Sequence, residues 1–194
     1  MSNRHKIILD LCGGTGAWSR PYAEAGYDVR VVTLPGQDVR TFNVQGFADK
    51  VHGILAAPPC TMFSLARTTA KIPRNTKQGM TTVAACLHII WECYHHGKPK
   101  WWALENPQGL LRYFLGKPAL TFNPCDYGDP YTKRTDLWGR FGEPKKAPVS
   151  ISPEMRKRLA TNTRPLPKMP NYTVAERRAL TPPGFARAFF EANP

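Results

Sequence analysis

Two consecutive prolines, Pro58 and Pro59, do most to constrain how this chain can fold. They follow the short apolar run at residues 54–57, which is typical of a buried strand. Because proline lacks the backbone N–H that a sheet needs, the strand must end there. The next residue, Cys60, therefore sits on a stiff backbone at the carboxyl end of a strand, where open α/β sheets bind their ligands. On this stretch alone, the thiol is either a packed core residue or a reactive group.

Apolar runs and helical periodicities alternate along the rest of the chain. Further strands are predicted at residues 6–11, 27–33, 101–108 and 119–122, with a return strand through residues 137–138. Helices are predicted at residues 17–25, 81–96, 109–115 and 153–159, and a last one after residues 182–183. This order indicates an α/β fold with a mostly parallel sheet.

Two of these helices have a recognisable apolar face. In the helix at residues 81–96 the predicted inner face is formed by Val83, Leu87, Ile90 and Trp91. In the last helix it is formed by Phe185, Ala188 and Phe189. Residues 68–79 are polar and basic, and they predict a mobile loop before the longer helix.

The charge balance bears on possible partners. The formal net charge is +13, from 27 Lys and Arg against 14 Asp and Glu, which favours a polyanion, nucleic acid first. A chain of 194 residues is expected to form a single domain at residues 1–194, with a basic, proline-rich insertion at about residues 140–178. We expect a monomeric cytoplasmic protein without a membrane partner, because no apolar run approaches the ~20 residues of a membrane span.

The cysteines favour neither disulfides nor metal. There are five, without a CxxC pair, so a disulfide framework is not expected. Four possible metal ligands occur on the predicted helix at residues 81–96: Cys86, His88, Cys93 and His95. They project from separate faces of that helix, so they are not expected to bind one ion.

A glycine-rich loop follows the first strand, in the sequence Asp10-Leu-Cys-Gly-Gly-Thr-Gly16. Strand, glycine loop and helix together are typical of a nucleotide-binding turn, although the spacing is not GxGxxG and the P-loop lysine is absent. A glycine-rich turn without a ligand is the alternative. Downstream, Asp38 is either a ligand-facing acid or a turn or capping carboxylate.

Two later segments carry polar groups of interest. The strand at residues 101–108 ends in Glu105-Asn106-Pro107, where the carboxylate is either a helix cap or a catalytic acid. Residues 123–139 form a turn-rich basic hairpin, which either contacts phosphates and bases or is merely solvated. In a doubly wound sheet, the glycine loop, Cys60 and Glu105 would share one edge, so a thiol and an acid would face the same cleft. That pair suits addition to an electron-poor ring, in which the thiolate attacks carbon and the acid protonates nitrogen.

These segments, taken in order, resemble the cytosine-5 DNA methyltransferases, and small phage-type members look most like this chain. The glycine loop is similar to the family's first motif, and Pro58-Pro59-Cys60 with Phe63-Ser64 matches the catalytic-loop motif. Glu105-Asn106 matches the glutamate–asparagine motif, and Tyr127-Gly-Asp-Pro130 with Lys133 and Arg134 is similar to the basic motif. The stretch at residues 182–188 resembles the helix that completes the cofactor site.

The resemblance implies a Rossmann-like methyltransferase fold, with helices on both faces of the sheet, and a function. The cofactor would be S-adenosyl-L-methionine, and the reaction would add a methyl group to carbon-5 of cytosine. Cys60 would attack carbon-6, Glu105 would protonate the ring nitrogen, Asn106 would orient the loop, and Arg134 would contact the base or steady the thiolate. If phage-encoded, the protein would act in the cytoplasm of a bacterial host.

The resemblance also implies two sets of binding residues. Those expected at the cofactor are Asp10, Cys12, Gly13, Gly14, Gly16, Trp18, Thr33, Asp38 and Pro58, with Asp38 accepting from the adenine amine. Those expected at nucleic acid are Ser64, Arg67, Lys133, Lys145 and Lys146. A duplex substrate would require base flipping, because carbon-6 cannot be reached inside the base stack.

The chain departs from the family pattern in several places. Thr33 stands where the family usually has an acid for the cofactor ribose, and Pro107 stands where it has valine. The family's Gln-x-Arg-x-Arg becomes Tyr131-Thr-Lys-Arg-Thr135, with the arginine shifted by one position. Only about forty residues, 139–176, occupy the place of a target-recognition domain. Low sequence specificity is therefore expected.

Three functions follow from this reading. The favoured one is cytosine-5 methylation of duplex or single-stranded DNA. The second keeps the same chemistry on RNA or a free cytosine nucleotide. The third is a catalytically silent nucleic-acid-binding protein, for which neither Cys60 nor Glu105 would be required.

Overall fold

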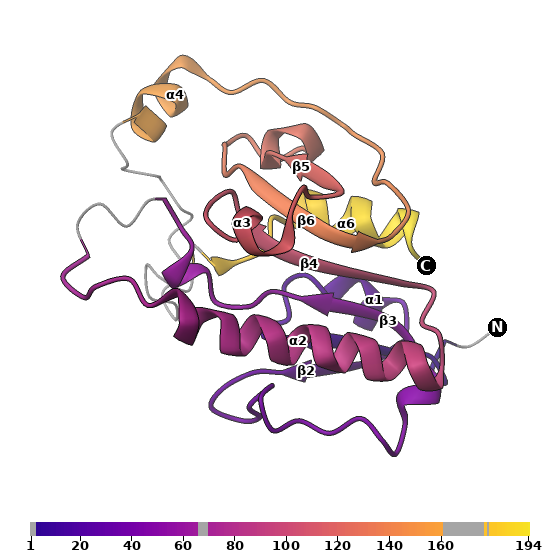
Figure 1. Ribbon diagram of the computed structural model, residues 1–194. Coiled ribbons are helices and arrows are strands. Elements are labelled where there is room, and N and C mark those ends of the chain that lie inside the picture. The colour runs from indigo at the N-terminus through magenta and orange to yellow at the C-terminus, as the bar shows by residue number, and fades with distance from the viewer. Residues whose placement is uncertain (1–2, 66–69, 161–176, 178) are drawn as a thin grey trace.

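The strand before Pro58 is part of a central sheet. The computed structural model describes residues 3–65, 70–160, 177 and 179–194, in which six strands have the order β2-β1-β3-β4-β6-β5 (Figure 1). The parallel strands are β1 (Ile7–Leu11), β2 (Asp28–Val32), β3 (Val51–Ala56) and β4 (Trp101–Pro107). The strands β5 (Leu120–Phe122) and β6 (Thr135–Arg140) complete the sheet in antiparallel pairing. The predicted mixed α/β fold with a mostly parallel sheet is confirmed.

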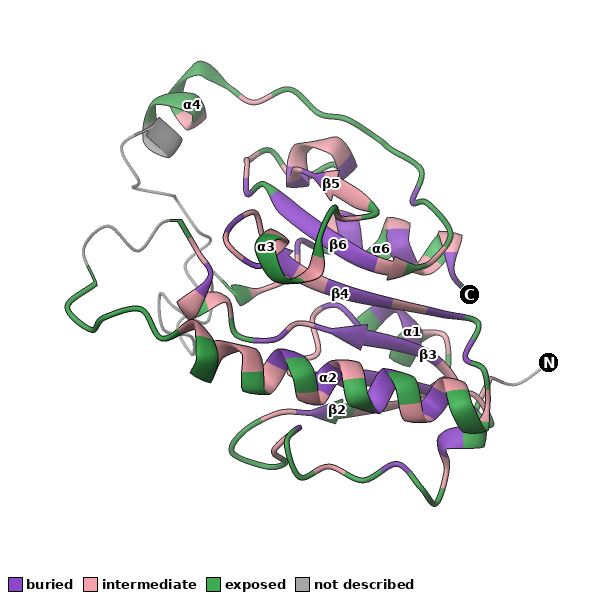
Figure 2. Ribbon diagram, in the orientation of Figure 1, coloured by how far each residue is buried: buried purple, intermediate pink, exposed green. Residues whose placement is uncertain are grey.

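The central strands are buried on both faces, which explains their nearly continuous apolar sequences. All five residues of β1 are buried, including the charged Asp10. At the edge of the sheet, β2 is mostly half-buried. Figure 2 shows burial along β3 and β4, whereas α2 (Thr76–His96) alternates between buried and exposed residues.

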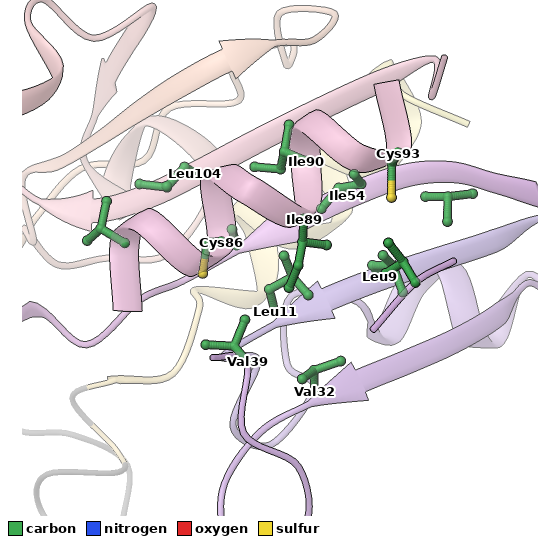
Figure 3. Close-up of a cluster of buried hydrophobic side chains, with 14 of the residues drawn as sticks. Leu9, Leu11, Val32, Val39, Ile54, Cys86, Ile89, Ile90, Cys93 and Leu104 are labelled. Carbon is green, nitrogen blue, oxygen red and sulfur yellow. The ribbon is translucent and has the colours of Figure 1, made fainter. Parts of the chain in front are cut away.

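The helix α2 covers one face of the sheet, and its side chains form a core with the strands beneath it (Figure 3). Its buried residues are Val83, Cys86, Ile89, Ile90 and Cys93. The predicted inner face was therefore wrong in part. Trp91 is 67% exposed, because the contact stripe runs through Cys86 and Cys93 and leaves Trp91 turned toward solvent.

The helix α2 also begins earlier than the predicted residue 81. The side chain of Asn75 caps it by accepting a 2.9 Å hydrogen bond from the backbone N–H of Gln78. The first helical turns are polar, so apolar periodicity gave no sign of them. The last part of the predicted loop, residues 76–79, is thus helical.

The opposite face is covered by α1 (Arg20–Glu24) and α6 (Pro183–Ala192). Aromatic rings fill this second core: Phe122 stacks on Phe185 at 3.9 Å between centroids, and Trp18 meets Phe189 edge-on at 5.4 Å. The buried residues of α6 are Phe185, Ala186 and Phe189, so the predicted Ala188 lies at the margin of the contact. Helices on both faces were expected, and this arrangement places the end of the chain against α1.

The remaining α-helices of the described residues are α3 (Arg112–Leu115), which follows β4, and α4 (Pro153–Ala160). Residues 141–150 have no regular structure. Arg67 and much of the predicted basic insertion, residues 161–176 and 178, lie outside the described residues. Within the described part of the chain, every helix is too short or too polar to cross a membrane.

Candidate active site

The turn that carries Cys60 lies at the carboxyl end of β3. Cys60–Met62 form a single 3₁₀ turn, and the Cys60 side chain is half-buried. The two prolines before it cannot donate backbone hydrogen bonds, so this part of the backbone can be fixed only by bonds that its carbonyls accept. The side-chain amide of Asn106 donates a 2.9 Å hydrogen bond to the carbonyl of Pro58. This bond joins the loop after β3 to the end of β4, where Glu105 lies.

Glu105 meets a lysine inside the site. Its side chain is 14% exposed, and the Oε1 atom lies 3.7 Å from Nζ of Lys133, whose side chain is 10% exposed. Lys133 also acts electrostatically on Cys60, so all three groups share one site. The neighbouring Arg134, predicted to contact the base or steady the thiolate, is exposed. The structure thus brings together Cys60, Glu105 and Lys133.

The three groups shift one another's protonation. Burial raises the pKa of the Glu105 carboxyl, and the Lys133 ammonium opposes this rise. Burial also raises the pKa of the Cys60 thiol, the negative charge of Glu105 raises it further, and Lys133 lowers it. In the free protein the site therefore favours a thiol and a carboxyl group whose ionisation depends on Lys133.

A buried carboxylate, that of Asp136, lies next to the site on the neighbouring strand β6. Asp136 lies on β6 opposite Asn106, and its side chain is fully buried. Its two oxygens accept from Nε and Nη2 of Arg112, each at 2.5 Å, and Thr121 donates to it at 2.8 Å. The bidentate pair balances the charge of Asp136, which still acts on Glu105 and raises the pKa of its carboxyl.

The glycine loop is built around Asp10. The Ser19 hydroxyl donates a 2.6 Å hydrogen bond to Oδ2 of Asp10, whereas Oδ1 is buried without a partner among the described residues. A Cβ atom at position 13 would lie 2.3 Å from the Asp10 carboxyl carbon, so only glycine fits there. At Gly14, φ is +56° and the space around a Cβ is open. The loop thus pairs an unsatisfied buried oxygen with an exposed, left-handed backbone that a ligand can approach.

A cavity of about 250 Å³ adjoins this loop at the carboxyl ends of β1 and β2. Three predicted cofactor residues, Cys12, Thr33 and Asp38, line it. Arg40 donates to both oxygens of Asp38, which lowers the pKa of that carboxyl to about 2. A hydrogen bond with Cys86 lowers the pKa of Cys12, against burial and the nearby carboxylates. The wall of the cavity therefore carries an Asp38–Arg40 ion pair, in which the Asp38 carboxylate stays ionised at neutral pH.

Other predicted residues lie away from this cavity. Trp18 belongs to the aromatic core, where its indole Nε1 has no partner among the described residues. Pro58 is buried, and Pro59 rather than Pro58 lines the cavity. Ser64 forms a bridge with Gly109 beside the site. Lys145 and Lys146 are exposed in the irregular segment at residues 141–150.

Several residues of the site had not been singled out from the sequence. They are Ser19, Arg40, Arg112 and Asp136.

Comparison with known proteins gave a family match and a structural similarity, which differ in weight. The family model for the C-5 cytosine-specific DNA methylases matches residues 18–122, which include Cys60 and Glu105. A solved structure from E. coli, described as a proposed DNA modification methyltransferase encoded within a prophage, is similar at 18% identity and a TM-score of 0.45. The similarity covers 76% of this chain and 52% of that one, so the chain spans about half the length of that protein. No curated protein sequence matched.

The family match is the decisive one, because it extends over more than half of the 194 residues and includes both strand-end loops of the site. The chain belongs to the C-5 cytosine-specific DNA methylase family.

Proposed function

We propose that this protein transfers a methyl group from S-adenosyl-L-methionine to carbon-5 of cytosine in DNA, through a covalent adduct on Cys60. The observation that carries the proposal is the grouping of Cys60, Glu105 and Lys133 at the ends of adjacent strands. A nucleophile, an acid and a cation in one partly buried site are the groups that addition to a cytosine ring requires.

Cys60 forms the first bond. Its sulfur adds to carbon-6 of the ring, the π bond between carbons 5 and 6 breaks, and the electron pair passes toward the ring nitrogen. The thiol must lose its proton for this step, although burial and the Glu105 charge raise its pKa. Lys133 acts in the opposite direction and stabilises the thiolate.

Glu105 supplies the proton that the ring nitrogen takes up. Its raised pKa favours the protonated form, which can donate. Protonating Glu105 also removes a negative charge beside Cys60, so the acid and the thiolate become available together. After donation, the carboxylate is left 3.7 Å from the Lys133 ammonium, which stabilises it.

The cofactor site fits the glycine loop and the adjoining cavity. S-adenosyl-L-methionine, when bound, supplies the methyl group to carbon-5. Cys12, Thr33 and Asp38 would hold its nucleoside part, and Asp38 is fixed in its ionised form by Arg40. Ligand sites typically occupy about 300–1,000 Å³, so the cavity of about 250 Å³ suits only part of the cofactor. The rest would extend over Gly13 and Gly14 toward the orphaned Asp10 oxygen. After methylation, water takes the carbon-5 proton and the ring nitrogen returns its proton to the Glu105 carboxylate. The bond between carbons 5 and 6 then re-forms as the sulfur–carbon bond breaks, which regenerates Cys60.

DNA is the substrate that best suits the charge and the family. We infer a single catalytic domain at residues 1–194, in which a basic segment at about residues 140–178 contacts the DNA backbone in place of a recognition domain. Lys145 and Lys146 are exposed and free to reach phosphates. Such contacts carry no sequence information, so low sequence specificity is expected.

Transfer of labelled methyl groups to duplex DNA, single-stranded DNA, RNA and dCMP tests the proposal. Cys60→Ala should abolish transfer and Glu105→Gln should reduce it strongly, whereas Cys125→Ala, a half-buried thiol on another loop, serves as the matched control. A DNA substrate containing 5-fluorocytosine should trap the protein through Cys60. If Cys60→Ala transfers methyl groups as fast as Cys125→Ala, the assignment of the nucleophile is wrong.

A further inference from the structure

The turn that carries Cys60 depends on groups outside it. Within the turn, the Cys60 carbonyl accepts from the backbone N–H groups of Phe63 and Ser64, at 2.9 and 2.8 Å. The carbonyls of Met62, Phe63 and Ser64 accept hydrogen bonds from residues of two other segments. How these carbonyls are held decides where the turn, and Cys60 with it, can sit.

One side is held by backbone. The N–H of Leu110 donates to the Phe63 carbonyl at 2.9 Å, and Ser64 bridges to Gly109. A Cβ atom at position 109 would lie 2.4 Å from the Phe63 oxygen, so the approach requires glycine. Phe63 itself is fully buried. This side ties the turn to the loop that follows Glu105 and Asn106.

The other side is held by one arginine. Arg74 donates from Nη1 to the Met62 carbonyl at 2.6 Å and from Nη2 to the Ser64 carbonyl at 3.1 Å. Asn75, the next residue, caps α2 and donates its N–H to the Met62 sulfur at 3.4 Å. The start of α2 and the turn after β3 lie side by side (Figure 1). Three successive carbonyls therefore have donors from alternate sides: Met62 and Ser64 accept from Arg74, and Phe63 accepts from Leu110.

The chemistry of this clamp favours arginine. A guanidinium presents several N–H donors in a planar fork, which reaches two carbonyls at once, whereas a lysine ammonium acts as a single mobile point charge. We propose that Arg74 is a positioning residue for the nucleophile: by clamping the carbonyls of Met62 and Ser64, it holds the Cys60 turn against the Glu105–Asn106 loop. The inference rests on the proposed function, since it assigns Arg74 a role in placing the attacking sulfur.

Arg74 is exposed, so a direct contact with a DNA phosphate is the competing role. The two roles differ in what lysine can replace. A phosphate contact needs mainly positive charge, which lysine supplies. A clamp on two carbonyls needs the fork, which lysine lacks.

The test compares Arg74→Ala and Arg74→Lys with Lys77→Ala, which removes an exposed cation three residues further along, in the first turn of α2. Two rates are measured: adduct formation with excess enzyme at saturating 5-fluorocytosine duplex, and alkylation of Cys60 by iodoacetamide, with Cys125 as internal reference. Misplacement of a reacting group by about 1 Å can cost about 100-fold, so Arg74→Ala should slow adduct formation by about 10-fold or more, and Arg74→Lys should recover only part. The Kd for the duplex should stay within about twofold of that of Lys77→Ala. Cys60 should be alkylated several-fold faster once the turn is released.

The proposal is overturned if both rates match those of Lys77→Ala while a weakened Kd is restored by Arg74→Lys, because that pattern belongs to a phosphate contact. If Arg74→Ala does not fold, as its melting temperature will show, Arg74→Lys carries the same comparison. A parent protein that forms no adduct with any DNA refutes the proposed function instead. The alkylation rates, which need neither DNA nor cofactor, then still decide whether Arg74 positions Cys60.

Discussion

The Asn106 side chain donates a 2.9 Å hydrogen bond to the carbonyl of Pro58, and so links the segment of the nucleophile to that of the acid. Asn106 is fully buried, and its Oδ1 has no partner among the described residues, so the amide is held by this single donor contact. Asn106→Ala should lower the free energy of unfolding by about 1–3 kcal/mol, since the buried Pro58 carbonyl loses its donor. Adduct formation with a 5-fluorocytosine duplex should slow by at least about 10-fold.

Urea unfolding and single-turnover kinetics measure these two effects. Asn43→Ala, at an exposed asparagine outside the site, is the matched control. Equal adduct rates for the two alanine variants would show that the Asn106 hydrogen bond does not determine the position of Cys60.

Lys133 rather than Arg134 should control the ionisation of the site. The Lys133 ammonium lowers the pKa of both Cys60 and Glu105, so Lys133→Met should raise both. The rate of Cys60 alkylation rises with the thiolate fraction, and its midpoint should therefore move to higher pH in that variant. Iodoacetamide alkylation measured across pH reports the midpoint. Arg134→Met removes a neighbouring but exposed charge and should move the midpoint much less; the reverse order would restore Arg134 as the cation of the site.

Local signals were sufficient for the elements that carry the site. The prolines at 58 and 59 fixed the end of β3 to within a residue, and the apolar run before Glu105 identified β4. Because the carboxyl ends of parallel strands lie at one edge of a sheet, the proximity of Cys60 and Glu105 also followed from the sequence. These inferences needed only periodicity and the chemistry of proline.

Other features depend on tertiary register, which periodicity does not contain. Lys133 faces inward because β6 pairs with β4 so that Asp136 lies opposite Asn106. The contact between Arg74 and the Met62 carbonyl joins residues 12 apart across a turn and has no local signature. On α2, the rotation that exposes Trp91 is set by how the helix sits on the sheet.

Asp10 should make stability depend on pH between about 4 and 6. Burial raises the pKa of Asp10 from its ordinary value of 3.8 to about 6, while hydrogen bonds from Ser19 oppose the rise. The folded state thus binds the proton more tightly than the unfolded state, so stability falls as pH rises from about 4 to 6 and levels off above. The contribution that is lost is roughly 3 kcal/mol. Urea unfolding of the parent and of Asp10→Asn at several pH values isolates it: the difference between them should change across this window, and a constant difference would contradict the assignment.

The buried ion pair between Arg112 and Asp136 should contribute to the stability of the fold next to the site. Asp136 is fully buried and accepts both of its charged hydrogen bonds from Arg112, so Arg112→Met would leave an unpaired carboxylate beside Glu105. Breaking a buried pair from one side typically costs about 3–5 kcal/mol, whereas replacing both partners with apolar residues is often close to neutral. The double variant Arg112→Met, Asp136→Leu should therefore recover much of the loss, and the melting temperatures of the single and double variants measure this. If the double variant is destabilised by as much as the two single variants added together, the pair contributes through its separate contacts and not through charge neutralisation.

The same pair should affect the pH dependence of the reaction. Because the charge of Asp136 raises the pKa of Glu105, Arg112→Met should shift the pH dependence of methyl transfer to higher pH, and Asp136→Leu should reverse that shift.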